Sequence, residues 1–409
     1  MKCRHCNASL TNTFLDLGFA PPSNAYLEAK DLLICEKYFP LKVMVCDQCW
    51  LVQTLDYANA EDLFREDYAY FSSTSSSFLN HAEKYCRNIT KKLALDENSF
   101  VIEVASNDGY LLKNFFSKNI PCLGIEPTHS TADVAEKIGI PVMREFFGEK
   151  VAINIAKLKQ KADLIIGNNV FAHVPDINDF SKGLASLLKP DGTITLEFPH
   201  LMKLLEFNQF DTIYHEHFSY LSLHTVTSIF KMAGLKVYDV EALDTHGGSI
   251  RVYGCHQDSD TKEKSSVKNM LHKESLCNMK KIDPYVLIQK SAEDIKNSFL
   301  QFLLDASNDG KKVAGYGAAA KGNTLMNFAG IKRDSISFVC DAAKAKQNKF
   351  LPGTHIPIYH PEKLILEPVD YIIIFPWNIA DEIKENLRKQ INYKTQFVTF
   401  IPELRIESA

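Results

Sequence analysis

The chain has 409 residues, of which 45% are hydrophobic and 23% are charged, and its net charge is −4. This length favours two or three domains, and the near-neutral charge offers no basic face for nucleic acid. The first residues, MKCRHCNASL, lack the apolar core of a signal peptide. Since no apolar run approaches the roughly 20 residues that a spanning helix needs, we expect a soluble, cytoplasmic protein that makes no membrane contact.

Two C-x-x-C pairs mark the N-terminal region, which we expect to span residues 1–70. The pairs are Cys3 with Cys6 and Cys46 with Cys49. Each pair can hold one side of a tetrahedral zinc ion, and two pairs close the site, which predicts a structural zinc. Four free thiols and a redox pair are the alternatives, although neither pair lies in the βαβ pattern of redox motifs. His5, inside the first pair, is expected to be a bystander.

Residues 71–256 alternate strand and helix patterns, which predicts a parallel α/β sheet with helices on both faces. The expected strands are 100–105, 121–126, 164–168 and 192–198, followed by a pair at 235–238 and 249–256.

The first three of these strands end in small or polar residues. The first strand carries Glu103 and is followed by a turn with Ala105, Ser106, Asn107 and Gly109; the second ends in Glu126, and the third leads into Asn168 and Asn169. Small residues let a ligand approach the backbone, and an acid at the second tip can accept both hydroxyls of an adenosine ribose. The order resembles the class I methyltransferase fold, in which Glu103 and the turn would hold the amino-acid part of S-adenosylmethionine. A dinucleotide site and a turn without function are the alternatives.

A histidine-rich segment follows the fourth strand. Residues 211–224 read DTIYHEHFSYLSLH, which brings Tyr214, His215, Glu216 and His217 together. Removing a proton from a carbon next to a ketone needs a base of near-neutral pKa, and histidine fits. A tyrosine hydroxyl can donate to the resulting enolate, and a carboxylate can orient the histidine. A metal site and histidines without a catalytic role are the alternatives.

Residues 257–409 begin with long charged helices and continue as a second α/β pattern. Its expected strands are 312–316, 335–339, 371–375 and 395–400. Gly315, Gly317 and Lys321 belong to the sequence GYGAAAKG, which follows a strand and opens a helix, and Asp341 ends the next strand. This is the dinucleotide fingerprint, but backbone amides at a helix N-terminus bind any phosphate. A nucleotide-sugar phosphate, bound NAD and a vestigial site are the three interpretations.

Together these motifs resemble one family, the sugar C-methyltransferases of deoxysugar biosynthesis. The resemblance covers nearly the whole chain and rests on MKCRHC with VCDQCWLVQ, SNDGYLL, NNVFAHVPD, EFPH followed by YHEHFSYLS, THGGSIRVY, and GYGAAAKGNT with LPGTHIPIY. Members join a cysteine zinc domain, a class I methyltransferase domain and a C-terminal Rossmann-like domain. The chain departs from the family pattern at Ala105, where glycine is common.

The resemblance implies a reaction and a set of roles. The family transfers a methyl group from S-adenosylmethionine to a carbon, commonly C-3, of a TDP-linked 4-keto-6-deoxysugar, whose nucleotide the C-terminal domain would hold. By this resemblance His217 is the base, Tyr214 lies near the sugar oxygen, Glu216 is the supporting carboxylate, and His173 and Tyr68 are further active-site residues. The rival functions are an NAD-dependent nucleotide-sugar epimerase or dehydrogenase and a non-catalytic zinc-ribbon interaction protein. A monomer or small homo-oligomer is expected.

Overall fold

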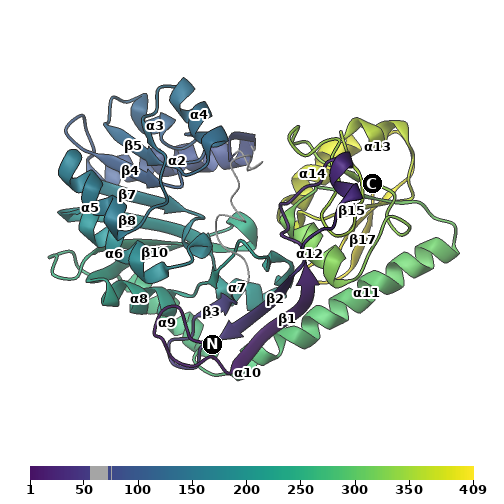
Figure 1. Cartoon of the computed structure of the whole chain (residues 1–409), viewed down its shortest axis with the longest axis horizontal. Helices are drawn as coiled ribbons and strands as arrows, with labels where there is room; N and C mark the ends of the chain where they lie inside the picture. The colour runs from purple at the N-terminus through teal and green to yellow at the C-terminus, as the bar shows by residue number, and fades with distance from the viewer. Residues whose placement is uncertain (56–71, 75) are drawn as a thin grey trace.

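The computed structural model of the chain describes residues 1–55, 72–74 and 76–409. Within these residues, the strands form a four-stranded, a seven-stranded and a six-stranded sheet. Figure 1 shows the seven-stranded sheet in one lobe and the six-stranded sheet in another, with β1 and β2 at the base between them and the long helix α11 (Ile288–Asn308) along the lower side of the second lobe. Among the described helices, none is both long and apolar enough to cross a membrane.

The N-terminal sheet is antiparallel and has the order β1-β2-β3-β9. Its strands are β1 (Asn12–Ala20), β2 (Phe39–Val45), β3 (Val52–Thr54) and β9 (Ser219–Tyr220). Leu41, Val43 and Val45 of β2 alternate along the strand and are buried, as one face of a strand packed on a core should be. Strand β9 comes from the histidine-rich segment and pairs with β3. The cysteine region and the histidine segment therefore share one sheet.

The central sheet has the order β10-β11-β8-β7-β4-β5-β6, with parallel pairs from β8 to β6 and antiparallel pairs at β11 and β10. Its strands are β4 (Val101–Val104), β5 (Cys122–Ile125), β6 (Val142–Met143), β7 (Ala162–Asn168), β8 (Leu188–Pro199), β10 (Leu235–Leu243) and β11 (Ser249–His256). Every residue of β4 and β5 is buried, as in parallel strands covered on both faces. The predicted sheet is confirmed, and the two-residue β6 was not predicted because it is too short to leave a pattern.

The helices of this region connect the strands and cover the sheet. They are α2 (Ser76–Leu93), α3 (Lys113–Phe116), α4 (His129–Lys137), α5 (Glu149–Leu158), α6 (Ile177–Leu187), α7 (Leu201–Glu206) and α8 (Leu223–Met232). Helix α6 shows why they form: Asp176 caps its N-terminus by accepting from two backbone amides, and Ile177, Phe180, Leu184 and Leu187 form its buried face.

The C-terminal lobe is a Rossmann-like sheet of order β14-β13-β12-β15-β16-β17, parallel except for β17. Its elements are β12 (Val313–Tyr316), α12 (Ala320–Phe328), β13 (Val339–Cys340), β14 (Ile358–Tyr359), α13 (Glu362–Leu366), β15 (Tyr371–Ile374), α14 (Ala380–Arg388), β16 (Gln396–Thr399) and β17 (Arg405–Ser408). The strands β14 and β17 were not predicted. Strand β13 is shorter than the predicted 335–339 and begins only at Val339, although the Ser337 amide still donates to the Val313 carbonyl.

Three helices join the two lobes: α9 (Ser265–Leu276), α10 (Asp283–Val286) and α11. Ala292, Ile295 and Phe299 recur at helical spacing along the buried face of α11. The helix also reaches the N-terminal sheet, because the Gln289 side chain accepts from the Asp16 amide of β1 at 2.8 Å. The N-terminal sheet is thus fixed to both lobes.

Candidate active site

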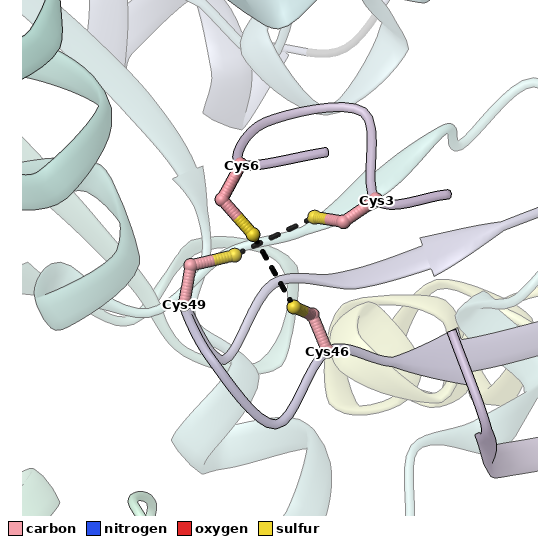
Figure 2. A group of neighbouring side chains, drawn as sticks. All are labelled: Cys3, Cys6, Cys46 and Cys49. Carbon is pink, nitrogen blue, oxygen red and sulfur yellow. Dashed lines mark hydrogen bonds between the residues drawn. The ribbon is translucent and has the colours of Figure 1, made fainter. Parts of the chain in front are cut away.

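The four predicted zinc ligands gather at one point. The sulfur atoms of Cys3, Cys6, Cys46 and Cys49 all lie within 4.8 Å of one another, and they point toward a common centre in Figure 2. Two sulfur–sulfur distances, Cys3 to Cys49 and Cys6 to Cys46, are 3.5 Å. Four thiols arranged this way suit a tetrahedral zinc ion and leave no open coordination position.

The two cysteine turns have the same backbone hydrogen bonds. The Cys3 amide donates to Ala8 and the Asn7 amide to Cys3, while the Cys46 amide donates to Leu51 and the Trp50 amide to Cys46. The residue after each pair, Asn7 or Trp50, is left-handed, with φ of 63° and 62°. Such a bulky residue as Trp50 adopts this conformation only where its surroundings demand it. Each turn is therefore a preformed half-site.

Side chains outside the cluster hold these turns in place. Gln53 is buried, donates to the Cys3 sulfur at 3.2 Å and accepts from the Arg4 amide at 2.9 Å. A hydrogen bond from the Cys49 thiol lowers the pKa of Cys3. The His5 ring contacts Asn178 of α6 and Ser228 of α8, so this histidine joins the cysteine region to the central lobe.

The turn after β4 has the conformation that a close ligand approach requires. Ala105, Asn107 and Gly109 all have positive φ, at 56°, 50° and 76°. A left-handed alanine costs about 1–2 kcal/mol, which gives a physical reason for the glycine that is common at the Ala105 position. The Glu126 carboxylate at the tip of β5 accepts from the amides of Asn107 and Thr128 at 2.9 and 3.0 Å and also from the Thr128 hydroxyl. Glu126 thus ties the two strand tips together and keeps lone pairs for a ligand.

Several buried polar atoms at this sheet edge have no hydrogen-bond partner among the described residues. They are Glu103 Oε2, Ser106 Oγ, Asp108 Oδ1, Asn168 Oδ1 and Asn169 Oδ1. Burial, followed by the charges of Asp108 and Glu126, raises the pKa of Glu103 well above its usual value. Unpaired buried atoms are costly, and a group of carboxylates favours a cation. The edge therefore fits the ammonium and sulfonium of S-adenosylmethionine better than the pyrophosphate of a dinucleotide.

His217 has a defined tautomer. Its Nδ1 lies 2.8 Å from the Thr212 carbonyl oxygen, which can only accept, so Nδ1 carries the proton. Nε2 is then the acceptor, and the Tyr214 hydroxyl donates to it at 2.8 Å. Burial, followed by the nearby His173, lowers the pKa of His217 well below 6.5. The ring is therefore a neutral base at physiological pH.

His173 packs directly against His217. The two rings meet edge to face with centroids 4.6 Å apart, and His173 Nδ1 donates to the Glu216 carbonyl oxygen at 2.7 Å. Burial lowers the pKa of His173 to about 4, so it too is neutral. His173 follows Asn168 and Asn169 by a few residues, which places the histidine pair beside the sheet edge described above.

The Glu216 side chain points to a different neighbour from the one we expected. Its Oε1 accepts from the Asn24 amide and side chain at 3.3 and 3.2 Å, while the Thr212 carbonyl orients the His217 ring. Burial raises the pKa of Glu216, whose Oε2 has no partner in the described part of the chain. His215 packs its ring against Phe39 with centroids 6.0 Å apart. Tyr68 lies outside the described residues.

The C-terminal glycine loop lies against the N-terminal segment. The Tyr26 hydroxyl and the Lys346 ammonium both donate to the Ala318 carbonyl, at 2.6 and 2.9 Å. The Asp341 carboxylate accepts from the amides of Ala318 and Ala343 at 2.7 and 2.8 Å. The acid that would bind a ribose in a dinucleotide site thus holds the backbone of its own loop.

Glycine is required at both predicted loop positions. A Cβ at Gly315 would collide with Phe375, and one at Gly317, where φ is 89°, would collide with Pro376. Lys321 in the first turn of α12 donates to Asn378 at 2.8 Å and lies over the Trp377 ring at 4.1 Å. Burial lowers the pKa of Lys321 to about 8.

The structure adds three residues that we did not single out from the sequence: Asp108, Asn24 and His246. Asp108 could have been found in the SNDGYLL motif, and His246 in THGGSIRVY, where two glycines follow a histidine. Asn24 lies 192 residues from Glu216, and its sequence context carries no signal for that contact.

Three family models match the chain in sequence. A zinc binding domain matches residues 3–64, a methyltransferase domain residues 78–240, and a C-methyltransferase C-terminal domain residues 244–402. The chain is similar to C-methyltransferase NovU of Streptomyces niveus, with 34% identity over 408 residues that cover 100% of this chain and 97% of that protein.

Solved structures show likeness over less than half of the chain. An S-adenosylmethionine-dependent methyltransferase from Clostridium acetobutylicum has 11% identity and a TM-score of 0.35, covering 44% of this chain and 92% of that one. The CcbJ methyltransferase from Streptomyces caelestis has 10% identity and a TM-score of 0.34, covering 43% and 89%.

Proposed function

The chain belongs to the S-adenosylmethionine-dependent C-methyltransferases, and on that basis we propose that it methylates a carbon next to the ketone, C-3, of a nucleotide-linked 4-keto-6-deoxysugar. This family membership favours the methyltransferase over the two rival functions, an NAD-dependent epimerase or dehydrogenase and a non-catalytic zinc-ribbon protein. Zinc in the cysteine cluster is structural.

The chemistry requires a base beside the reacting carbon. S-adenosylmethionine supplies an electrophilic methyl group, so the accepting carbon must carry an electron pair. A proton next to a ketone is acidic enough for a neutral histidine to remove, provided that the enolate oxygen is stabilised. The proposed sugar offers such a proton at C-3.

One observation carries the proposal: His217 is a buried neutral imidazole whose Nε2 accepts from the Tyr214 hydroxyl at 2.8 Å. When the sugar binds, the Tyr214 hydroxyl turns to the keto oxygen and frees Nε2 to take the C-3 proton. The Thr212 carbonyl keeps Nδ1 protonated throughout, so the resulting imidazolium retains a partner for that proton. His217 is the base, and Tyr214 stabilises the enolate.

The remaining predicted residues take supporting roles in this proposal. His173 holds the Glu216 backbone and packs against the base, and Glu216 and Tyr68 contact the sugar. On the cofactor side, Glu126 binds the ribose hydroxyls. The β4 turn and the neighbouring strand tip bind the amino-acid end, through Glu103, Ala105, Ser106, Asn107, Gly109, Asn168 and Asn169.

The nucleotide end of the substrate is assigned to the C-terminal glycine loop. Gly315 and Gly317 allow a phosphate to approach the α12 N-terminus, where Lys321 adds positive charge. The segment from Asn24 to Tyr26 supports this assignment, because it contacts Glu216 at one end and the glycine loop at the other. A substrate lying along this segment would reach from the loop to the catalytic histidines.

A methyl-transfer assay tests the proposal. The enzyme is incubated with labelled S-adenosylmethionine and a panel of TDP-, CDP- and GDP-linked 4-keto-6-deoxysugars, together with their 4-hydroxy counterparts. We expect a carbon-methylated product from the keto-sugars, with TDP preferred, and none from the 4-hydroxy sugars, because they form no enolate. Methylation of the 4-hydroxy sugars at equal rate would contradict the enolate mechanism.

A further inference from the structure

The turn between β10 and β11 lies at the same edge of the central sheet as the catalytic histidines. It contains the 3-10 helix η5 (Thr245–Gly247) and comes from the motif THGGSIRVY. Ser249, the first residue of β11, pairs with Pro199 at the end of β8. The Thr245 hydroxyl donates to the Glu197 carboxylate of β8 at 3.1 Å. The turn is therefore anchored beside the strand tips.

Contacts from both lobes fix the turn. The Gln209 side chain donates to the Gly247 carbonyl at 2.8 Å, and a Cβ at Gly247 would collide with the Trp377 ring of the C-terminal lobe. Trp377 in turn donates to Asp211 at 2.7 Å. These contacts leave little freedom for the residue in the middle of the turn.

That residue, His246, is held in a strained conformation with its side chain facing inward. Its φ of 54° and ψ of 23° lie in the left-handed region, which is uncommon outside glycine, although histidine adopts it more often than most residues. Its ring meets Phe78 edge on at 6.0 Å between centroids, while its Nε2 is buried and has no hydrogen-bond partner in residues 1–55, 72–74 and 76–409. Burial, followed by the charge of Lys321, lowers the pKa of His246 to about 4, so the ring is neutral.

A histidine that served only to fill space would have its nitrogen paired or be replaced by an apolar residue, because an orphaned buried nitrogen costs free energy. Strain of this kind persists where surrounding structure imposes it and is common at ligand sites. The Lys321 ammonium lowers and the Glu197 carboxylate raises the pKa of the ring, and this mixture of charges suits the oxygen atoms of a neutral sugar.

We infer that His246 contacts the substrate. Its Nε2 forms a hydrogen bond with an oxygen of the sugar and thereby holds the sugar ring over His217. The inference rests on the proposed function, since it takes the substrate to be an oxygen-rich sugar. It assigns the turn between β10 and β11 a role in sugar specificity, separate from the base and from the cofactor residues.

Calorimetric binding and kinetics of three variants test this. We expect H246A to bind the nucleotide-sugar about tenfold more weakly, the value of one neutral hydrogen bond, while its affinity for S-adenosylmethionine and for the nucleotide alone stays unchanged. H246N should recover most of the loss, because asparagine keeps a hydrogen-bonding group and tolerates the left-handed conformation. D244A, an exposed position in the same turn, is the matched control and should behave as wild type.

Deoxy-sugar analogues locate the partner oxygen. Wild-type enzyme should bind the analogue that lacks the partner oxygen about tenfold more weakly than the full sugar. H246A should bind this analogue and the full sugar equally well. Unchanged sugar affinity in H246A, or an equal loss for S-adenosylmethionine, would overturn the inference. If wild-type enzyme binds the sugar through His246 but transfers no methyl group to it, the contact stands and the proposed reaction falls.

Discussion

The cysteine cluster and the histidine cluster are built in opposite ways. The four thiols come from two short turns with identical backbone hydrogen bonds, and each turn is complete within about six residues. The histidine cluster combines the end of β7, the YHEH segment and, beside them, the β10–β11 turn and the first turn of α12. One site is local and repeated, whereas the other is assembled from distant parts.

The two sites also differ in how completely their polar atoms are paired. Gln53 supports the Cys3 sulfur, and the cluster needs only a metal ion to be closed. Around the histidines, Glu216 Oε2, Tyr220 Oη and His246 Nε2 lack partners among the described residues. The polar atoms of the structural site thus find partners within the site, while the proposed reactive site leaves buried polar groups for its ligands to pair with.

Removing the proposed base should have the largest effect on the reaction. General base catalysis contributes about 10²–10⁴-fold, so we expect H217A to lose roughly that much kcat while binding both ligands normally. In heavy water without a methyl donor, wild-type enzyme should exchange the C-3 proton of the sugar, and H217A should not. H129A, at an exposed position on α4, is the control. Full exchange by H217A would mean that His173 or another neighbouring residue is the base.

Removing one cysteine of the cluster should lower the stability of the fold. It should not change the turnover of the molecules that remain folded. We expect C46S to lose zinc and on the order of 4 kcal/mol of unfolding free energy, the stabilisation that a ligand gives at a thousand times its dissociation constant. Metal analysis and denaturant titration measure both quantities. C277S, at an exposed cysteine outside the cluster, should change neither. A zinc-depleted enzyme that stays folded but stops turning over would assign the metal to catalysis instead.

A change at Glu126, in the proposed cofactor site, should alter S-adenosylmethionine affinity without affecting either cluster. Glu126 at the tip of β5 accepts from two backbone amides and from the Thr128 hydroxyl, which leaves acceptor capacity for the proposed ribose contact. Loss of a charged hydrogen bond costs about 1.5–3 kcal/mol, so E126Q should weaken S-adenosylmethionine binding by about 10- to 100-fold. Calorimetry with E145Q, an exposed neighbour, as control gives the comparison. An unchanged dissociation constant would place the ribose elsewhere.

The same contrast explains what the sequence could predict. The zinc ligands and the tips of β4, β5 and β7 were predictable because short spacings and strand ends determine them. The orientation of His217 was not, because it depends on the Thr212 carbonyl, and every residue has a carbonyl. The Asn24–Glu216 contact depends on the pairing of β3 with β9, which neither strand shows in its own pattern.

The C-terminal loop should give a smaller effect, confined to the substrate. Lys321 is partly buried and already contacts Asn378, so the loss of its charge removes one contact among several at the proposed phosphate site. We expect K321A to raise the KM for the nucleotide-sugar about threefold to tenfold and to leave S-adenosylmethionine affinity unchanged. K344A, exposed on the same lobe, is the matched control. Tightly bound NAD in purified enzyme would instead make this loop a dinucleotide site.

The smallest expected change is in the pH dependence of proton exchange. An ordinary histidine with a pKa of about 6.5 is about three-quarters protonated at pH 6 and would lose most of its activity as a base. Burial and the neighbouring His173 hold the pKa of His217 well below that value, so the base stays neutral as the pH falls from 7.5 to 6. We therefore expect the exchange rate to change less than about twofold over this range.

The free energy of unfolding should depend on pH although the exchange rate does not, and this difference provides an internal check. Because His173 and His217 are neutral when folded, the unfolded chain takes up protons first, and the free energy of unfolding falls as the pH drops below 6.5. Thermal melts should shift downward while the exchange rate of the folded enzyme stays level. A rate that instead falls fourfold between pH 7.5 and 6 would mean that the base titrates as an exposed histidine, and the buried pair could not then be the catalytic one.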